Sequence, residues 1–236
     1  MLPKSVQCVV ADYLNAAVEK GIRAGGRLLM RDTWLFPEPV ESDGAIVLVG
    51  QERRAAAKSI REQHYTASIP SGKSVYVRYG AAIVIWSIPA NKNIGRFLFG
   101  WDAKVWELSR LWAPDGHDHN LLTRAISAAV RVIKRLERPA ALVSYADPNA
   151  GHHGGVYRAA SWLYHGQCTE SRAYRDSNGR VVARRKFHSG KRGWPKVEIE
   201  ARGLVELKLP GKYRFVRVLS KRAKRELRLN DDVSMS

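Results

Sequence analysis

The amino-acid sequence predicts a mixed α/β fold, with a mostly antiparallel central sheet, one parallel crossover and helices on both faces. The first observation is a strand, an amphipathic helix and a second strand in succession between residues 104 and 145. Such a unit places its two strands parallel in one sheet. The second observation is that strand-like runs separated by short turns flank this unit, and such runs pair antiparallel. We therefore expect one mixed sheet organised around a single crossover.

The N-terminal half predicts helices and strands from its hydrophobic spacing. Apolar residues at intervals of three and four indicate helices, whereas short apolar runs bounded by glycine or proline indicate strands. In order, the expected elements are a helix over 5–20, a loop over 34–44, a strand from Ala45, a helix over 51–65, two strands within 74–90 that turn at 78–80, a short strand at 96–100 and a strand at 104–112.

The crossover helix has the clearest pattern in the chain. Asp118 or Asn120 can cap its start, and Pro139 ends it before the strand at 140–145. Its apolar positions fall at alternating spacings of four and three, which gives one buried face. These positions are Leu122, Ile126, Ala129, Ile133 and Leu136.

Antiparallel patterns continue to the C-terminus. Asn178–Gly179 separates two alternating runs at 167–175 and 180–188 and predicts a hairpin. Two further strands, 205–209 and 213–219, flank a proline and a glycine and can form a second pair. This order of elements matches the GNAT acyltransferase fold. We expect a GNAT-like catalytic core over residues 1–170, and a basic hairpin and tail over 171–236 that completes the sheet and binds nucleic acid.

The charge is strongly positive and unevenly distributed. The chain carries a formal net charge of +18, and residues 171–236 contain 19 basic and 7 acidic side chains. Such a surplus, interleaved with aromatic residues, indicates a nucleic-acid partner, although a solvated basic face is the alternative. The residues expected to bind phosphates, with an affinity that falls with salt, are Arg184, Arg185, Lys186, Lys191 and Arg192.

Compartment is indicated by what the sequence lacks. Its apolar runs are all shorter than the roughly 20 residues that cross a bilayer, and the first residues do not resemble a signal peptide. The two cysteines, Cys8 and Cys168, are too few for a disulfide framework. We expect a protein of the bacterial cytoplasm with no membrane partner; the sequence leaves its oligomeric state open.

Reactive side chains cluster where the second crossover strand ends. Ser144, Tyr145 and Asp147 precede a loop rich in glycine and histidine, and Tyr157 lies in the short helix that begins near residue 156. Asp147 can act as a general base or form a turn. Tyr157 can donate a proton or pack in the core. The adjacent histidines, His152 and His153, point in different directions, so joint metal binding is not expected.

Three other segments contribute candidate residues. His64 and Tyr65 end the second helix, where His64 can line a cleft or cap the helix as a cation. Ser109 and Arg110 lie on the first crossover strand, and a buried Arg110 needs an anion, for which Asp147 is the natural candidate. A final pair, Asn91 and Asn93, can read a base edge or form a turn.

The turn before the crossover helix argues against acetyl-CoA. Pyrophosphate is usually held there by glycine-rich backbone and the helix N-terminus. Residues 114–119 instead read PDGHDH, with one glycine and two aspartates. These carboxylates repel a pyrophosphate, so we expect another group donor.

Several blocks resemble the phage Mom family of DNA-modification proteins, across roughly residues 40–220. They are HYTAS, AIVIWSIPANKNIG, ELSRLWAPDG, VSYADPNAGHHGGVYRAASWLYHGQ and PGKYRFVRVL.

The resemblance implies a GNAT-like transferase that adds a carbamoylmethyl group, of the glycinamide type, to the exocyclic amine of adenine in double-stranded phage DNA and so protects it from restriction. It implies functional roles for His64, Tyr65, Ser109, Asp147 and Tyr157. The residues themselves suggest, as substrate-binding candidates, Tyr145, Ser144, Arg110, Asn91 and Asn93. A glycine-type donor such as glycyl-tRNA fits the product, which makes tRNA a possible partner, and iron is a cofactor candidate with no ligand set identified.

Two other functions stay open from the residues alone. One is an ordinary N-acyltransferase acting on a small amine or a protein, which tight acetyl-CoA binding would favour. The other is a DNA-binding protein without enzymatic activity, which unchanged nucleoside composition in expressing cells would favour.

Overall fold

The computed structural model describes residues 44–179, 181–183, 199 and 201–228. The helix predicted over 5–20 and the loop over 34–43 lie outside the described residues, as do the predicted phosphate-binding residues Arg184, Arg185, Lys186, Lys191 and Arg192. The described elements are β1 (Ala45–Leu48), α2 (Gly50–Gln63), β2 (Ser74–Tyr79), β3 (Ala82–Ser87), α3 (Ile94–Phe99), β4 (Val105–Trp112), α4 (Leu121–Glu137), β5 (Ala141–Ala146), the 3-10 turn η1 (Pro148–Ala150), α5 (Gly155–Ala159), β6 (Leu163–Gln167), β7 (Ser171–Arg175), β8 (Val181–Ala183), β9 (Val205–Leu209), β10 (Tyr213–Val218) and α7 (Lys221–Glu226). Within this described part, no helix is both long and apolar enough to span a bilayer.

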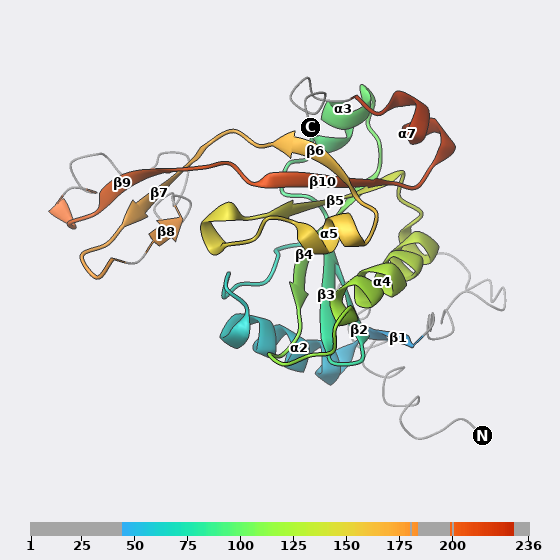
Figure 1. Ribbon diagram of the computed structural model, residues 1–236, viewed down its shortest axis with the longest axis horizontal. Coiled ribbons are helices and arrows are strands. Elements are labelled where there is room, and N and C mark those ends of the chain that lie inside the picture. The colour runs from blue at the N-terminus through green and yellow to red at the C-terminus, as the bar shows by residue number, and fades with distance from the viewer. Residues whose placement is uncertain (1–43, 180, 184–198, 200, 229–236) are drawn as a thin grey trace, which may run out of the picture.

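The larger sheet confirms the predicted mixed topology. Its seven strands run in the order β1-β2-β3-β4-β5-β10-β6, as Figure 1 shows. β4 and β5 pair parallel, and the other neighbouring strands pair antiparallel. The parallel pair is the crossover that surrounds α4.

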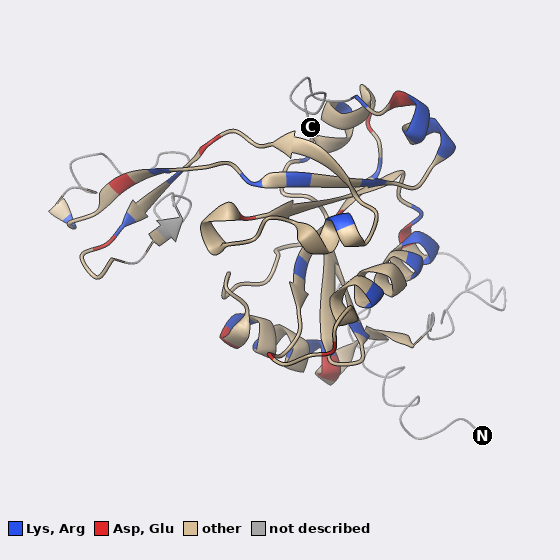
Figure 2. Cartoon of the chain, viewed as in Figure 1, with Lys and Arg blue, Asp and Glu red and all other residues tan. Residues whose placement is uncertain are grey.

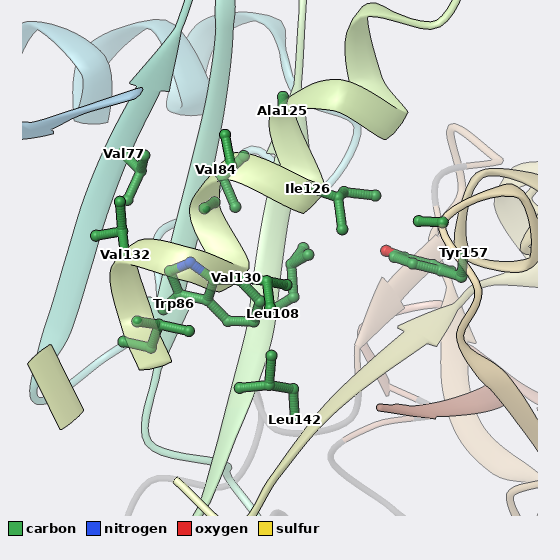
Figure 3. Packing of buried hydrophobic residues seen from close by; sticks show 14 of the residues in the cluster. Val77, Val84, Trp86, Leu108, Ala125, Ile126, Val130, Val132, Leu142 and Tyr157 are labelled. Atoms are coloured by element: carbon green, nitrogen blue, oxygen red, sulfur yellow. The ribbon is translucent and has the colours of Figure 1, made fainter. Parts of the chain in front are cut away.

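Helices cover both faces of this sheet, as predicted. On one face α4 packs over Val84, Trp86 and Leu108, which Figure 3 shows from close by. On the other face, α2 places Ile60 against Ile85. Val84 and Ile85 are consecutive, but Val84 faces α4 and Ile85 faces α2, because successive side chains of a strand point to opposite faces of the sheet. Burying each such side chain contributes about 1.5–3 kcal/mol.

α4 follows its predicted apolar stripe, and its fully buried positions include Ile126, Ala129 and Ile133. It ends at Glu137, before Pro139, as expected. The predicted cap differs from the structure. Asn120 takes the N-cap position, but its backbone is left-handed, with φ at 66°, and its side chain makes no capping hydrogen bond.

The strand predicted at 96–100 is wrong, because α3 occupies residues 94–99. Ile94 and Leu98 are buried, and this spacing of four places them on one side of a helix. Gly100 then ends the helix with a left-handed backbone, φ 81°. The apolar run at 96–100 is too short to distinguish the 3.6-residue period of a helix from the two-residue period of a strand.

A smaller sheet, ordered β8-β7-β9, extends away from the larger one (Figure 1). It confirms the hairpin around Gly179. The expected pairing of β9 with β10 is wrong, since β9 pairs with β7 and β10 lies between β5 and β6. Pro210 and Gly211 carry the chain straight from one sheet into the other, so no turn forms there. The boundary at residue 170 stays a prediction, and β10 belongs to the larger sheet.

Candidate active site

A pocket opens where the two parallel strands separate. Their pairing begins at Val105 and stops at Leu108 opposite Ser144, although β4 continues to Trp112 and β5 to Ala146. Beyond that point β4 pairs only with β3, and β5 only with β10. A pocket of about 300 Å³ lies between the two separated ends. Its lining consists of His64, Tyr65, Leu108, Ser109, Leu111, Leu122, Tyr145, Ala146, Gly151, His152, His153, Gly154, Gly155, Val156 and Tyr157.

The loop after β5 forms one wall because its backbone is held tightly. The Asp147 side chain accepts a hydrogen bond from the backbone N–H of Asn149 at 3.1 Å, which starts η1. Gly154 adopts φ 78°, and a Cβ there would lie 2.2 Å from the Phe215 ring. Only glycine allows this approach to β10. The predicted turn-forming role of Asp147 is therefore real, whatever else it does.

Asp147 lies beside the pocket, and its carboxylate forms an ion pair with Lys212. Asp147 Oδ2 and Lys212 Nζ are 2.8 Å apart, and the aspartate side chain is 15% exposed. Burial alone would raise the pKa of Asp147, but hydrogen bonds from Lys212 and Asn149 outweigh it, and the pKa is lowered. The group is thus a carboxylate at neutral pH, able to hold or deprotonate an amine.

His64 is held as a neutral imidazole. Its Nδ1 accepts a hydrogen bond from the Thr66 backbone N–H at 3.1 Å, which places the ring proton on Nε2. Burial first, then the positive charges of Arg110 and His152, lower its pKa to about 4, against a hydrogen bond to the Leu111 backbone. His64 does take the C-cap position of α2, where its backbone N–H donates to the Ile60 carbonyl, but its lowered pKa keeps the imidazole neutral rather than cationic.

Tyr65 stands at the pocket mouth between two imidazoles. Its ring centroid lies 4.6 Å from that of His64 and 4.8 Å from that of His152. The side chain is 50% exposed, so its ring can still receive a flat partner by stacking. Desolvation raises its pKa, and the charge of Asp147 adds to this against Lys212 and Arg110. The phenol is therefore protonated and able to donate.

Tyr157 forms the inner end of the pocket. It is buried against Trp162 and Phe215, and Figure 3 shows its hydroxyl directed toward β4 and α4. Burial raises its pKa to about 12, partly offset by a hydrogen bond with Ser144. Ser144 in turn donates to the Leu108 carbonyl at 2.9 Å. The ring of Tyr157 thus packs in the core, as one of its two predicted roles required. The other role, proton donation by its hydroxyl, stays a prediction.

Ser109 lines the pocket from β4, and its hydroxyl forms a short hydrogen bond with that of Ser87. The neighbouring Arg110 donates from Nε to the Ser68 carbonyl at 2.7 Å and from Nη2 to the Ser68 hydroxyl at 3.1 Å. Asp147 forms its ion pair with Lys212. The orienting role expected of Arg110 toward Asp147 stays a prediction.

Two predicted residues lie elsewhere. Asn91 and Asn93 are in the turn before α3, where the Asn91 side chain accepts from the Asn93 backbone N–H at 2.9 Å. Neither lines the pocket. The structure therefore brings His64, Tyr65, Ser109, Tyr145 and Tyr157 into one lining, with Asp147, Ser144 and Arg110 directly behind or beside it.

His152 and His153 separate as expected. His152 faces Tyr65, while the His153 ring lies 6.4 Å from that of Tyr213. The described residues gather no group of three or more histidine, cysteine, aspartate or glutamate side chains that could hold a metal ion. Nδ1 of His64 is already hydrogen-bonded to the Thr66 backbone N–H, and iron as a cofactor stays a prediction without a ligand set.

Two residues close to the pocket, Glu107 and Lys212, were not predicted from the sequence. Burial raises the pKa of Glu107 on β4, against a hydrogen bond from the Ala90 backbone and the charges of Arg110 and Lys212. Burial raises the pKa of Tyr145 to about 12, with Glu107 adding to it. Alternation along β4 was the available signal for Glu107. Lys212 gave none, because it meets Asp147 only through tertiary structure.

Fold and site together define an α/β protein with a polar pocket between the splayed ends of two parallel strands. A family model of the Mom protein family matches residues 46–233, and the chain belongs to that family. It is 29% identical over 210 residues to the methylcarbamoylase mom of Escherichia phage Mu, covering 81% of this chain and 86% of that protein.

Proposed function

We propose that the protein is a transferase that places a carbamoylmethyl group on the exocyclic amine of adenine in phage DNA, in the cytoplasm of the host. The observation that carries the proposal is the pocket, where a carboxylate and two protonated phenols adjoin one small cavity. Membership of the Mom family, the relative named methylcarbamoylase, and the net charge of +18 support the same function.

The reaction requires the target adenine to leave the duplex. An adenine amine is a weak nucleophile within a stack, so the enzyme extracts the base into its pocket. Tyr65, half exposed at the mouth, offers a ring face for stacking the extruded adenine. Its tilted neighbours, His64 and His152, lie with ring centroids 4.6 and 4.8 Å away and help to hold that ring in place.

Asp147 and the phenols then move protons. Asp147, kept as a carboxylate by Lys212, accepts a proton from the amine as it attacks the donor carbonyl. Tyr65 or Tyr157, both protonated at neutral pH, gives a proton to the departing oxygen. The phenol that donates is restored from solvent, and Asp147 releases its proton there.

The donor in this proposal is an activated glycine such as glycyl-tRNA. Attack on its carbonyl releases the tRNA hydroxyl and forms a glycyl amide. That amide is an isomer of the carbamoylmethyl product. Its conversion breaks the bonds from the adenine nitrogen to the carbonyl carbon and from the CH2 carbon to the glycine nitrogen, and it forms bonds from the adenine nitrogen to the CH2 carbon and from the carbonyl carbon to the glycine nitrogen. The aspartates of residues 114–119 support a donor without a pyrophosphate bound at that turn.

We also propose that the fold is GNAT-like. The supporting features are the antiparallel strands β1 to β4, the crossover through α4, and the separation of β4 from β5 at their carboxyl ends. Ligands in α/β sheets commonly bind outside the carboxyl ends of strands.

Mass spectrometry of nucleosides from expressing cells tests the function. We expect a modified deoxyadenosine, heavier by one carbamoylmethyl group in place of hydrogen, and its loss in Asp147→Asn. Asp102→Asn is the matched control, because Asp102 is 76% exposed and pairs with Arg96 away from the pocket. Unmodified DNA from the folded wild type would refute the function, and full modification by Asp147→Asn would remove that residue from the mechanism.

A further inference from the structure

The solvent-facing side of α4 carries only positive charge. Its exposed charged residues are Arg124, Arg131, Lys134, Arg135 and Arg138, the last at the C-cap. We call these five residues the α4 basic stripe, and Figure 2 shows it along the helix. The one carboxylate of α4, Glu137, is 13% exposed and paired with Lys73 and Lys104 at 2.6 and 2.9 Å. It therefore does not neutralise the stripe.

Compensation of the helix dipole does not explain this arrangement. Cations are favoured near a helix C-terminus and disfavoured near its N-terminus. Lys134 and Arg135 fit that rule, but Arg124 lies in the first turn, which has no acidic residue. The stripe thus extends against the dipole toward the pocket, which Leu122 lines.

The stripe ends in a groove of about 540 Å³. The groove is lined by Arg131, Lys134, Arg135, Arg138, Pro139 and Leu219. Most of its lining is cationic, and arginine, the majority type, presents a planar fork that matches phosphate oxygens. A concave, arginine-rich surface is the expected form of a phosphate site.

Tertiary structure also forces two cations together beside this groove. Arg217 of β10 donates to the Ala160 carbonyl at 3.0 Å. Burial lowers the pKa of Arg217, and the positive charge of Arg131 lowers it further. A phosphate bound in this part of the groove would be attracted by both guanidinium groups.

We infer that the α4 basic stripe and its groove bind the phosphate backbone of the DNA duplex that flanks the extruded base. This rests on the proposed function. The seventeen residues of α4 span about 25 Å at about 1.5 Å each, which corresponds to about seven base pairs at about 3.4 Å per pair. One end of the stripe adjoins the pocket, so a duplex with its target base there reaches the groove within one helical turn.

Duplex DNA is favoured over an acidic protein because the stripe is continuous with the pocket. A partner that delivers a base to the pocket must place its neighbouring phosphates on the surrounding surface. The five positions of the stripe, 124, 131, 134, 135 and 138, are spaced by seven, three, one and three residues, so all of them lie on one side of the helix. No base-reading group is needed, since such contacts position the duplex without specifying sequence.

The test compares two triple variants of the full chain. The stripe variant is R124Q/R131Q/R135Q. The matched control is R54Q/K58Q/R61Q, which removes the same charge from exposed positions on α2, the helix on the other face. Affinity for a fluorescent random-sequence duplex is measured by anisotropy across salt concentrations, and thermal unfolding is recorded for both variants.

We expect the stripe variant to lose about tenfold or more in affinity, with the slope of log K against log salt reduced by about 2.7, because each lost phosphate contact removes about 0.9. The control should keep the wild-type slope. The thermal midpoint of the stripe variant should stay close to that of the wild type, since the three substituted side chains are exposed.

Nucleoside analysis separates failure of this inference from failure of the proposed function. Wild-type modification with equal salt slopes for the stripe variant and wild type would overturn the inference and leave the function standing. Loss of modification in the stripe variant with its DNA affinity intact would also overturn it, since the surface would then bind another partner. Absence of modification by wild type would refute the function, and with equal slopes would overturn both.

Discussion

Replacing Lys212 with methionine should raise the pKa of Asp147 toward its ordinary range. The substitution keeps the length of the side chain but removes the ammonium that lies 2.8 Å from the carboxylate. Asp147 would then keep its burial, which raises its pKa, and lose the largest contribution that lowers it. Lys212 is not itself placed in contact with substrate, so we describe it as a positioning residue.

The magnitude follows from the exposure of the pair. Lys212 is 46% exposed and Asp147 is 15% exposed. Exposed pairs contribute about 0.2–1 kcal/mol, and breaking a buried pair costs about 3–5 kcal/mol. For this intermediate case we expect the pair to contribute about 1.5 kcal/mol to the free energy of unfolding at neutral pH. Because the pKa of Asp147 is lowered in the folded protein, this stabilisation is present above its ordinary pKa and lost as pH falls through the folded value.

Carbon NMR of aspartate side chains measures the shift directly, with Asp147→Asn identifying the resonance. Lys212→Arg should restore the wild-type titration, because it returns the charge. Lys212 also acts on Glu107, so the titration is repeated in Glu107→Gln, where the shift should persist. An unchanged Asp147 titration in folded Lys212→Met would refute the ion-pair reasoning. Nucleosides from the same cells show whether loss of the pair also reduces modification.

Three further predictions concern the pocket walls. Gly154→Ala should destabilise the protein by about 3 kcal/mol or more, measured by chemical denaturation, because a left-handed backbone and a contact with Phe215 are combined; an effect below about 1 kcal/mol would contradict the packing. Tyr157→Phe should cost about 1 kcal/mol for the lost hydrogen bond with Ser144, and nucleoside analysis then shows whether its hydroxyl is needed for modification. His64, whose pKa is lowered to about 4, is neutral in the fold, so its contribution is present above its ordinary pKa and lost as pH falls from there toward 4. His64→Gln should flatten the pH dependence of stability in that window by about 1–2 kcal/mol, after allowing for solvent screening; an unchanged curve would contradict this.

The sequence was most informative where structure is local. The structure contains the apolar face of α4, the end of that helix before Pro139, and the strands β4 and β5. Each of these features was predicted from the residue pattern of a single segment. Residues 96–100 were misread because so short a run fits either period. The pairing of β9 was misread because a proline and a glycine between two strands do not require a turn.

The site was predictable only in part, because its geometry depends on contacts between distant segments. His64, Tyr65 and Tyr157 could be identified as candidates, but their common lining depends on the separation of β4 from β5. That separation has no sequence signature. The pairing of Asp147 with Lys212 was likewise hidden, and Arg110 seemed the better partner because its strand is the neighbouring one.

β10 links the pocket to the groove at the other end of α4. Lys212, which pairs with Asp147, immediately precedes this strand, and Arg217, whose pKa is lowered by the charge of Arg131, lies near its end. β10 is paired on both sides, with β5 and β6, which fixes these two positions relative to each other. They are separated by about 17 Å, at about 3.4 Å per residue. The distance between phosphates bound at the groove and a base bound in the pocket would therefore be fixed by β10, a central strand, and would not depend on a hinge.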